Sequence, residues 1–305
     1  MYLSDPRVLP VLFIIFSAQC LNAQGCDEYT DDMARMKFFP LASAAYSSFP
    51  QRCIENKYGN ATLATYYSGE CDPDPSDSCA GFTAVLHDDE ALVLSFRGTA
   101  RFMQLVEEAD LSTLHRKVSS QENGHLSKIN FDSANSTHQT RWIAGGYVST
   151  YFYKAFMAVW NGGLKESFKN LHAKYPSYFV WVTGHSLGGA LASLAASYII
   201  AEENINGSNV SYSYRVVHWR DLVPHIPMKG FEGYWHHNSE VFYPYNMEKG
   251  SNFTICQADE SRHCSDGLLY DLSVYDHLHY FNKDVSKYGE DGCIDVDVTP
   301  PSSNV

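Results

Sequence analysis

Residues 178–189 carry the sequence YFVWVTGHSLGG, which decides the fold class. Residues 178–183 are β-branched or aromatic, as is typical of a strand, and residues 190–203 are rich in alanine and leucine, as is typical of a helix. Between them, the glycines of Gly184-His185-Ser186-Leu187-Gly188 permit a tight turn that places Ser186 where the helix begins. This order of strand, turn and helix predicts a nucleophile elbow. The alternative is a serine that only caps the helix.

The pattern on either side of this stretch alternates between strands and helices. Residues 91–96 are apolar throughout, so we expect a strand that is covered on both faces. Further strands are predicted at residues 82–86 and 212–219, and helices at residues 31–48, 147–175 and 190–203, with a break at Pro40 and another near Asn161-Gly162-Gly163. Alternating strands and helices predict an α/β fold with a mostly parallel central sheet.

The 305 residues, 45% of them apolar, are sufficient for one large core. The apolar run at residues 8–18 is too short to span a bilayer, follows Arg7 and precedes small residues around Ala23. It predicts a signal peptide at residues 1–23 and a single secreted domain at residues 24–305. No other stretch is long and apolar enough to predict a transmembrane anchor.

Export predicts disulfides and glycosylation. Seven of the eight cysteines would lie in the mature chain, and buried free thiols are the alternative to pairing. Short spacings favour Cys71 with Cys79 and Cys256 with Cys264, while Cys26 with Cys293 could join the termini and leave Cys53 unpaired. Acceptor motifs for N-glycosylation occur at Asn60, Asn135, Asn206, Asn209 and Asn252.

The net charge of −13 argues against a nucleic-acid partner, because it repels phosphate backbones. Contact with lipid must therefore be apolar. No cofactor is predicted. His236-His237 and His277-x-His279 could pair on zinc, but the chain has no His-Glu-x-x-His motif and no cysteine cluster at ligand spacing, so no metal is predicted.

A serine hydroxyl is a weak nucleophile at neutral pH, so Ser186 needs a histidine base and a carboxylate that orients it. Where such an elbow occurs, the acid follows the serine in the chain and the histidine comes last. Asp221 comes directly after the strand at residues 212–219, at the sheet edge where functional groups gather, and is the predicted acid. Six histidines follow it, and spacing does not choose among them: His225, His236, His237, His263, His277 and His279.

Five segments together resemble the class 3 lipases related to the filamentous-fungal triacylglycerol lipases, including secreted nematode members. They are residues 94–99 (LSFRGT), 182–192 (VTGHSLGGALA), 215–227, 240–243 (EVFY) and 276–281 (DHLHYF), and the resemblance extends from about residue 27 to 283. It implies an α/β-hydrolase fold and the hydrolysis of acylglycerols at an oil-water interface. It also implies that Ser186 is the nucleophile, Asp221 the acid and His277 the base. The implied oxyanion hole consists of Thr99 and the backbone N–H of Leu187, although Thr99 could be a plain turn residue.

After Thr99, a short segment has apolar residues at helical spacing, including Phe102, Leu105 and Val106, opposite a carboxylate-rich face. On its own it could simply cover the core. In the lipases that it resembles, this segment is a lid that moves aside at an oil-water interface.

The chain departs from the family pattern between Ser186 and Asp221, which are only 35 positions apart. The elbow helix takes about half of these, and the remainder, including residues 204–212, leaves room for one strand. The sequence therefore predicts that one strand-helix unit is omitted, which would leave a gap in the sheet or shift the next strand by about 4.8 Å. The alternative to an active lipase is an impaired variant that acts as a secreted lipid-binding or inert protein.

Overall fold

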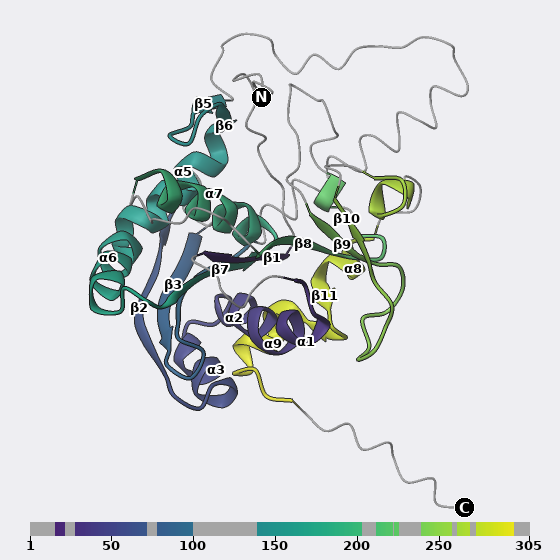
Figure 1. The fold of residues 1–305 in the computed structure, drawn as a ribbon, viewed down its shortest axis with the longest axis horizontal. Helices are drawn as coiled ribbons and strands as arrows, with labels where there is room; N and C mark the ends of the chain where they lie inside the picture. Colours follow the sequence, from purple (N-terminus) through teal and green to yellow (C-terminus); the bar gives the residue numbers. More distant parts are fainter. Residues whose placement is uncertain are drawn as a thin grey trace, which may run out of the picture.

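The computed structural model describes residues 16–21, 28–71, 78–99, 139–202, 212–221, 223–225, 239–257, 261–268 and 273–295. A single eight-stranded sheet forms the centre, in the order β10-β9-β8-β1-β7-β4-β3-β2 (Figure 1). Its strands are β1 (Phe16–Leu21), β2 (Ala61–Glu70), β3 (Ser78–Leu86), β4 (Ala91–Phe96), β7 (Phe179–His185), β8 (Tyr212–His218), β9 (Glu240–Tyr243) and β10 (Thr254–Cys256).

The sheet is mixed, so the expectation of a mostly parallel sheet is wrong. Among the described strands, only β4 with β7 and β8 with β9 are parallel neighbours. The hairpins β2-β3-β4 and β9-β10 make antiparallel pairs, and β1 is antiparallel to both β7 and β8. Strands β4, β7, β8 and β9 nevertheless point the same way, because two antiparallel steps through β1 restore the direction.

Helices cover both faces of the sheet (Figure 1). One layer contains α5 (Thr150–Val159), η2 (Trp160–Leu164), α6 (Lys165–Lys174) and α7 (Leu187–Glu202). The other contains α1 (Asp31–Met33), η1 (Ala34–Phe38), α2 (Phe39–Ala44), α3 (Pro50–Lys57) and α9 (Val285–Glu290). Shorter elements are β5 (Gln139–Arg141), β6 (Tyr147–Ser149), η3 (Val223–His225), η5 (Ser265–Leu268), α8 (Val274–Leu278), β11 (His279–Tyr280) and β12 (Lys283–Asp284).

Local sequence explains most of these boundaries. The predicted first helix begins at Asp31, where the Thr30 hydroxyl accepts a 3.1 Å hydrogen bond from Met33 N. The helical segment continues through Pro40, because this proline lies in the first turn of α2, where a missing N–H is tolerated. The second predicted helix is interrupted at Gly163, whose φ of +146° suits glycine. Its predicted start is wrong, because residues 147–149 pair with β5 as β6.

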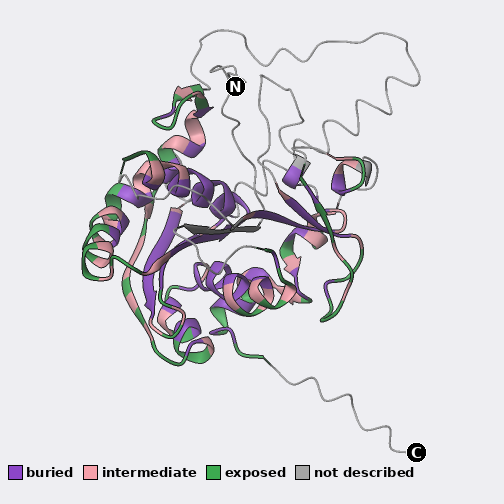
Figure 2. Cartoon of the chain, in the orientation of Figure 1, coloured by how far each residue is buried: buried purple, intermediate pink, exposed green. Residues whose placement is uncertain are grey.

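The core lies on both faces of the sheet (Figure 2). Every residue of β4 is buried, as its continuous apolar sequence predicts. Helix α7 is buried along its first ten residues, which explains why it lacks an amphipathic pattern: it packs on β7 and β4 while α5 packs on α7. The strand and helix on either side of Ser186 are therefore held rigidly.

The site of the predicted omission is occupied by the N-terminal strand. The structure has neither an empty gap after β7 nor a direct pairing of β7 with β8, because β1 pairs with both of them. Residues 16–21 lie within the predicted signal peptide, whose cleavage remains a prediction.

Three disulfides join described cysteines. Cys71–Cys79 and Cys256–Cys264 are confirmed as local pairs. Cys293 pairs with Cys53, so the predictions that Cys53 is unpaired and that Cys293 pairs with Cys26 are wrong. The reason is tertiary: α3 and α9 both pack against α2, which brings Cys53 of α3 close to Cys293, three residues after the end of α9. Cys26 lies outside the described residues.

The described residues include only some of the predicted glycosylation sites and none of the predicted lid residues. Asn60 and Asn252 are exposed, whereas the other three acceptor asparagines lie outside the described residues. Within the described part of the chain, no helix is both long and apolar enough to cross a membrane. The predicted lid residues Phe102, Leu105 and Val106 also lie outside it.

Candidate active site

Ser186 lies between β7 and α7, as the elbow prediction requires. Its φ is +60°, a strained value for a residue with a side chain, and only 3% of its surface is exposed. The flanking glycines make this turn possible, because a Cβ on Gly184 would overlap the backbone of Gly188, and a Cβ on Gly188 would overlap that of Phe96. The turn therefore presents Ser186 at the N-terminus of α7.

Asp221 and His277 form a buried pair. His277 Nδ1 lies 3.1 Å from both carboxylate oxygens of Asp221, and neither residue is exposed. Asp221 Oδ1 also accepts a 2.9 Å hydrogen bond from Val223 N, and Oδ2 accepts one of 2.7 Å from Tyr280 Oη. The carboxylate is thus held from three sides and in turn holds the imidazole.

This pairing defines the chemistry open to His277. When Nδ1 carries the proton that faces Asp221, Nε2 has a free lone pair and can accept a proton. Nε2 is buried and has no hydrogen-bond partner among the described residues. His277 therefore has the orientation of a general base, although its Nε2 makes no hydrogen bond with a described residue.

Among the candidate histidines whose side chains the structure describes, His277 is the one that pairs with Asp221. His263 is exposed, and His279 stacks on Tyr275 with ring centroids 3.9 Å apart and its Nδ1 2.8 Å from Tyr275 O. The side chains of the three remaining candidates, His225, His236 and His237, lie outside the described residues.

The sequence did not reveal the role of His185, which joins the two halves of the site. Its Nε2 donates to His277 O at 2.8 Å, and its Nδ1 accepts from Tyr46 Oη at 2.7 Å. The His185 and His277 rings stack with centroids 4.6 Å apart. Burial and the neighbouring His277 hold the pKa of His185 well below its usual value, so it stays neutral. His185 lies in the elbow motif, but its distant partners leave no sequence signal.

Tyr280 is a second residue whose role the sequence did not reveal. Burial, followed by the Asp221 carboxylate, raises the pKa of Tyr280 well above its usual value. The phenol therefore remains protonated and donates to Asp221. Its position three residues after His277 is the only sequence signal.

The predicted oxyanion donors come from two neighbouring elements. Thr99 is 6% exposed and follows β4, whose Phe96 is the register partner of Gly184 on β7. The intervening Gly98 lies so close to the elbow that an added Cβ would be 2.8 Å from Ser186 Cβ. Leu187 begins α7, where the backbone N–H groups have no partner within the helix. Both predicted donors thus flank Ser186.

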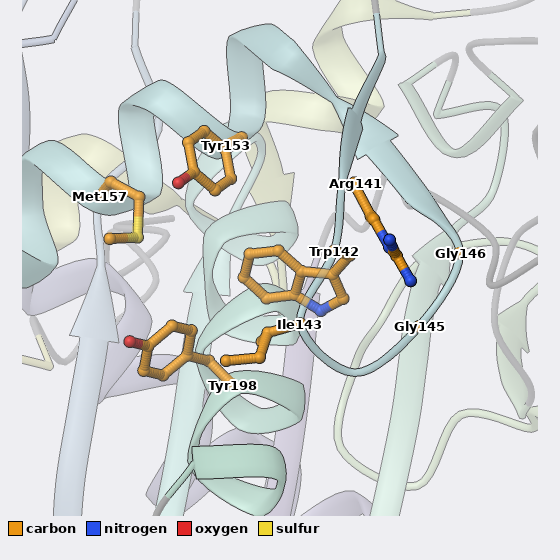
Figure 3. Close-up of a pocket in the computed structure, with 8 residues that line it drawn as sticks. All are labelled: Arg141, Trp142, Ile143, Gly145, Gly146, Tyr153, Met157 and Tyr198. Atoms are coloured by element: carbon orange, nitrogen blue, oxygen red, sulfur yellow. The ribbon is translucent and has the colours of Figure 1, made fainter.

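A separate aromatic pocket of about 540 Å³ lies between the β5-β6 hairpin and helices α5 and α7 (Figure 3). Trp142, Tyr153, Met157 and Tyr198 line it. Tyr198 follows Ser186 by 12 positions along α7, or about 18 Å at 1.5 Å per residue. This pocket is therefore distinct from the candidate active site.

Comparison with known proteins identifies the family. Residues 93–212 match the family model "Lipase (class 3)". The chain is 31% identical to the Caenorhabditis elegans protein Lipase ZK262.3, in an alignment that covers 87% of this chain and 83% of that protein. The chain belongs to the class 3 lipase family. A class 3 lipase is a carboxylic ester hydrolase that acts on lipid esters, and this activity class follows from membership.

Solved structures confirm the α/β-hydrolase fold of this class 3 lipase. The Rhizomucor miehei triacylglyceride lipase superposes with a TM-score of 0.61 at 20% identity, covering 85% of this chain and 97% of its own. Lipase II of Rhizopus niveus gives the same TM-score and identity, with 88% and 98% covered.

The two matches differ in how much of the chain they cover. The match to Lipase ZK262.3 extends over 321 positions, more than the 305 residues of the chain, so the chain has gaps in it. The family model ends at residue 212, where β8 begins. Thr99 and Ser186 lie inside the matched residues, whereas Asp221 and His277 lie outside them, so the assignment of the latter two rests on the pairing described above.

Proposed function

We propose that this class 3 lipase hydrolyses acylglycerols through an acyl-enzyme formed on Ser186. The observation that carries the proposal is the buried Asp221–His277 pair, whose free Nε2 belongs to the same site as the strained Ser186. This combination supplies a nucleophile, a base and an orienting acid.

In the proposed reaction, Ser186 Oγ transfers its proton to His277 Nε2 and attacks the acyl carbon of the ester. The oxyanion accepts hydrogen bonds from Thr99 and from Leu187 N, and Asp221 stabilises the imidazolium. His277 then protonates the leaving alcohol. Water, activated by His277, releases the fatty acid and restores Ser186. Proton transfer needs Oγ and Nε2 within about 3 Å, so the two side chains must reach this separation before attack.

The proposed setting is an extracellular or secretory compartment, with lipid at an oil-water interface as substrate. The three disulfides and the exposed acceptor motifs at Asn60 and Asn252 support this setting. The lid proposed around Phe102 would expose apolar surface for acyl chains at the interface.

Labelling with a fluorophosphonate probe tests the nucleophile. The full chain, produced in a secreting host, should be labelled and should hydrolyse emulsified tri- and diacylglycerol. Ser186→Ala should lose both properties, while the control Ser48→Ala, at an exposed position, should keep both. Labelling or turnover that persists in Ser186→Ala would refute the proposed nucleophile.

An impaired lipid-binding protein is the second candidate. The short connection from Ser186 to Asp221 favours it. A folded wild-type chain that binds lipid vesicles but shows neither labelling nor turnover would establish this function instead.

A further inference from the structure

The oxyanion loop, residues 97–99, follows β4 and is held on its inner side by the nucleophile elbow. Gly98 has no room for a side chain, because an added Cβ would lie 2.5 Å from Tyr46 Oη and 2.8 Å from Ser186 Cβ. The backbone N–H of Gly98 donates to Tyr46 Oη, and Tyr46 in turn donates to His185 Nδ1 at 2.7 Å. The place of the predicted oxyanion donor therefore depends on where this short loop lies.

Arg97 provides a second anchor, on the side of the oxyanion loop that faces β3. The backbone N–H of Arg97 donates to Ala80 O at 2.9 Å, which continues the ladder of β4 with β3 by one residue. Its guanidinium extends further, to the first residue of β3, where Nη2 donates to Ser78 Oγ at 2.7 Å and also to Ser78 O. Because a guanidinium is planar and rigid, these contacts fix the direction in which the chain leaves β4.

A disulfide fixes the place of Ser78. Ser78 begins β3 and lies opposite Glu70, the last residue of β2. Cys79, the next residue, is fully buried and is joined to Cys71, which directly follows Glu70. The bridge therefore closes the β2-β3 hairpin at the point where Arg97 is attached.

The two local disulfides among the described cysteines lie at opposite ends of the strands, although each spans 8 positions. Strand β3 is antiparallel to β4, so Cys79, near the start of β3, lies beside the end of β4 that leads to the oxyanion loop. Cys256 instead lies opposite Glu240, which begins β9, a strand parallel to β8. The first bridge is thus at the end of the sheet that carries the candidate active site, and the second is at the other end.

We infer that Arg97 is a positioning residue for the oxyanion hole, and that the Cys71–Cys79 disulfide is the fixed support to which it is attached. Arg97 acts on Thr99 through the loop, and not on the ester itself. The inference rests on the proposed function of Ser186 and Thr99. Loss of an oxyanion donor costs about 100- to 1000-fold in kcat, so a loop that keeps only its inner anchor should lose a part of this, about 10- to 100-fold.

Arg97→Met in the full chain tests this anchor. The kcat for p-nitrophenyl butyrate and the rate of fluorophosphonate labelling should both fall about 10- to 100-fold, because both reactions place negative charge in the oxyanion hole. KM and the pH dependence of kcat should stay unchanged, since the Asp221–His277 pair is not altered. Arg97→Lys should recover only part of the loss, because an ammonium cannot replace the planar guanidinium. A kcat within about twofold of the wild type, or a loss with a shifted pH dependence, would overturn the inference.

The two disulfides supply a matched pair of variants. Cys71→Ser/Cys79→Ser should lower kcat and labelling about 10-fold, whereas Cys256→Ser/Cys264→Ser, with the same separation, should keep both within about twofold. Adding Arg97→Met to the first variant should cost less than the two losses combined, because both changes remove one anchor. Equal kcat in the two disulfide variants, or fully additive losses, would overturn the inference. A folded wild-type chain with neither labelling nor turnover would instead refute the proposed function.

Discussion

Replacing Tyr280 with phenylalanine tests how the acid is held. Tyr280 Oη donates its 2.7 Å hydrogen bond to Asp221 Oδ2 in a fully buried environment. The substitution removes this donor but keeps the aromatic ring, so it loosens the carboxylate without opening a large cavity. Among the described residues, the carboxylate of Asp221 then keeps its contacts with Val223 N and His277 Nδ1. His218 N, 3.3 Å from Oη, also loses an acceptor.

The expected size of the effect follows from this hydrogen bond. A hydrogen bond to a charged group contributes about 1.5–3 kcal/mol. If that stabilisation serves the Asp221–imidazolium pair of the transition state, kcat falls about 10- to 150-fold in Tyr280→Phe. KM should stay unchanged, because the hydroxyl is buried behind Asp221. Steady-state hydrolysis of p-nitrophenyl butyrate measures both constants, and urea unfolding measures stability.

Tyr58→Phe is the matched control for this substitution. Tyr58 is also buried, and its Oη donates a 2.6 Å hydrogen bond to Lys37 O, on the helical layer away from Ser186. Its loss should lower the free energy of unfolding by about 1 kcal/mol and leave kcat unchanged. If Tyr280→Phe also lost only stability and kept kcat within about twofold of the wild type, the orienting role of Tyr280 would be refuted.

Three further substitutions probe stability. Because the pKa of His185 lies well below 6.5 in the folded chain, only the unfolded chain binds a proton at this side chain just below pH 6.5. The free energy of unfolding should therefore fall by up to about 1.4 kcal/mol per pH unit below pH 6.5, and His185→Gln should flatten that slope. Cys53→Ser/Cys293→Ser opens a bridge across 240 positions and should cost about 5 kcal/mol in thermal unfolding. Glu240→Gln removes the buried countercharge of Arg215, 2.8 Å away, and should cost about 3–5 kcal/mol in urea unfolding.

Each of these has a control and a contradicting result. Equal pH slopes in the wild type and the His185→Gln variant would show that His185 titrates normally. Cys71→Ser/Cys79→Ser opens a bridge across only 8 positions and should cost about 2.5 kcal/mol; an equal loss in both disulfide variants would contradict the loop-length argument. Arg215→Met/Glu240→Leu should recover much of the stability lost in Glu240→Gln, and no recovery would contradict the buried-charge argument.

The parts of this lipase that were predictable from the sequence are local. The strand before Ser186 and the helix after it follow from β-branched, alanine and leucine residues in continuous runs, and Gly184 is needed because the backbone of Gly188 approaches it within the same turn. The buried strand β4 is equally evident from its apolar sequence. The local disulfide Cys71–Cys79 spans only 8 positions. In each case, the deciding contacts lie close together in the chain.

Contacts between distant segments decided the rest. Position alone could not choose among six histidines, and only the placement of α8 beside the end of β8 brings His277 to Asp221. The pairing of Cys53 with Cys293 depends on the packing of α3 and α9 on α2. The sequence by itself thus determined the elbow around Ser186 and the family. Only the tertiary structure decided which strand fills the slot between β7 and β8, because a strand's neighbours in a sheet are chosen by hydrogen-bonding edges that are remote in sequence.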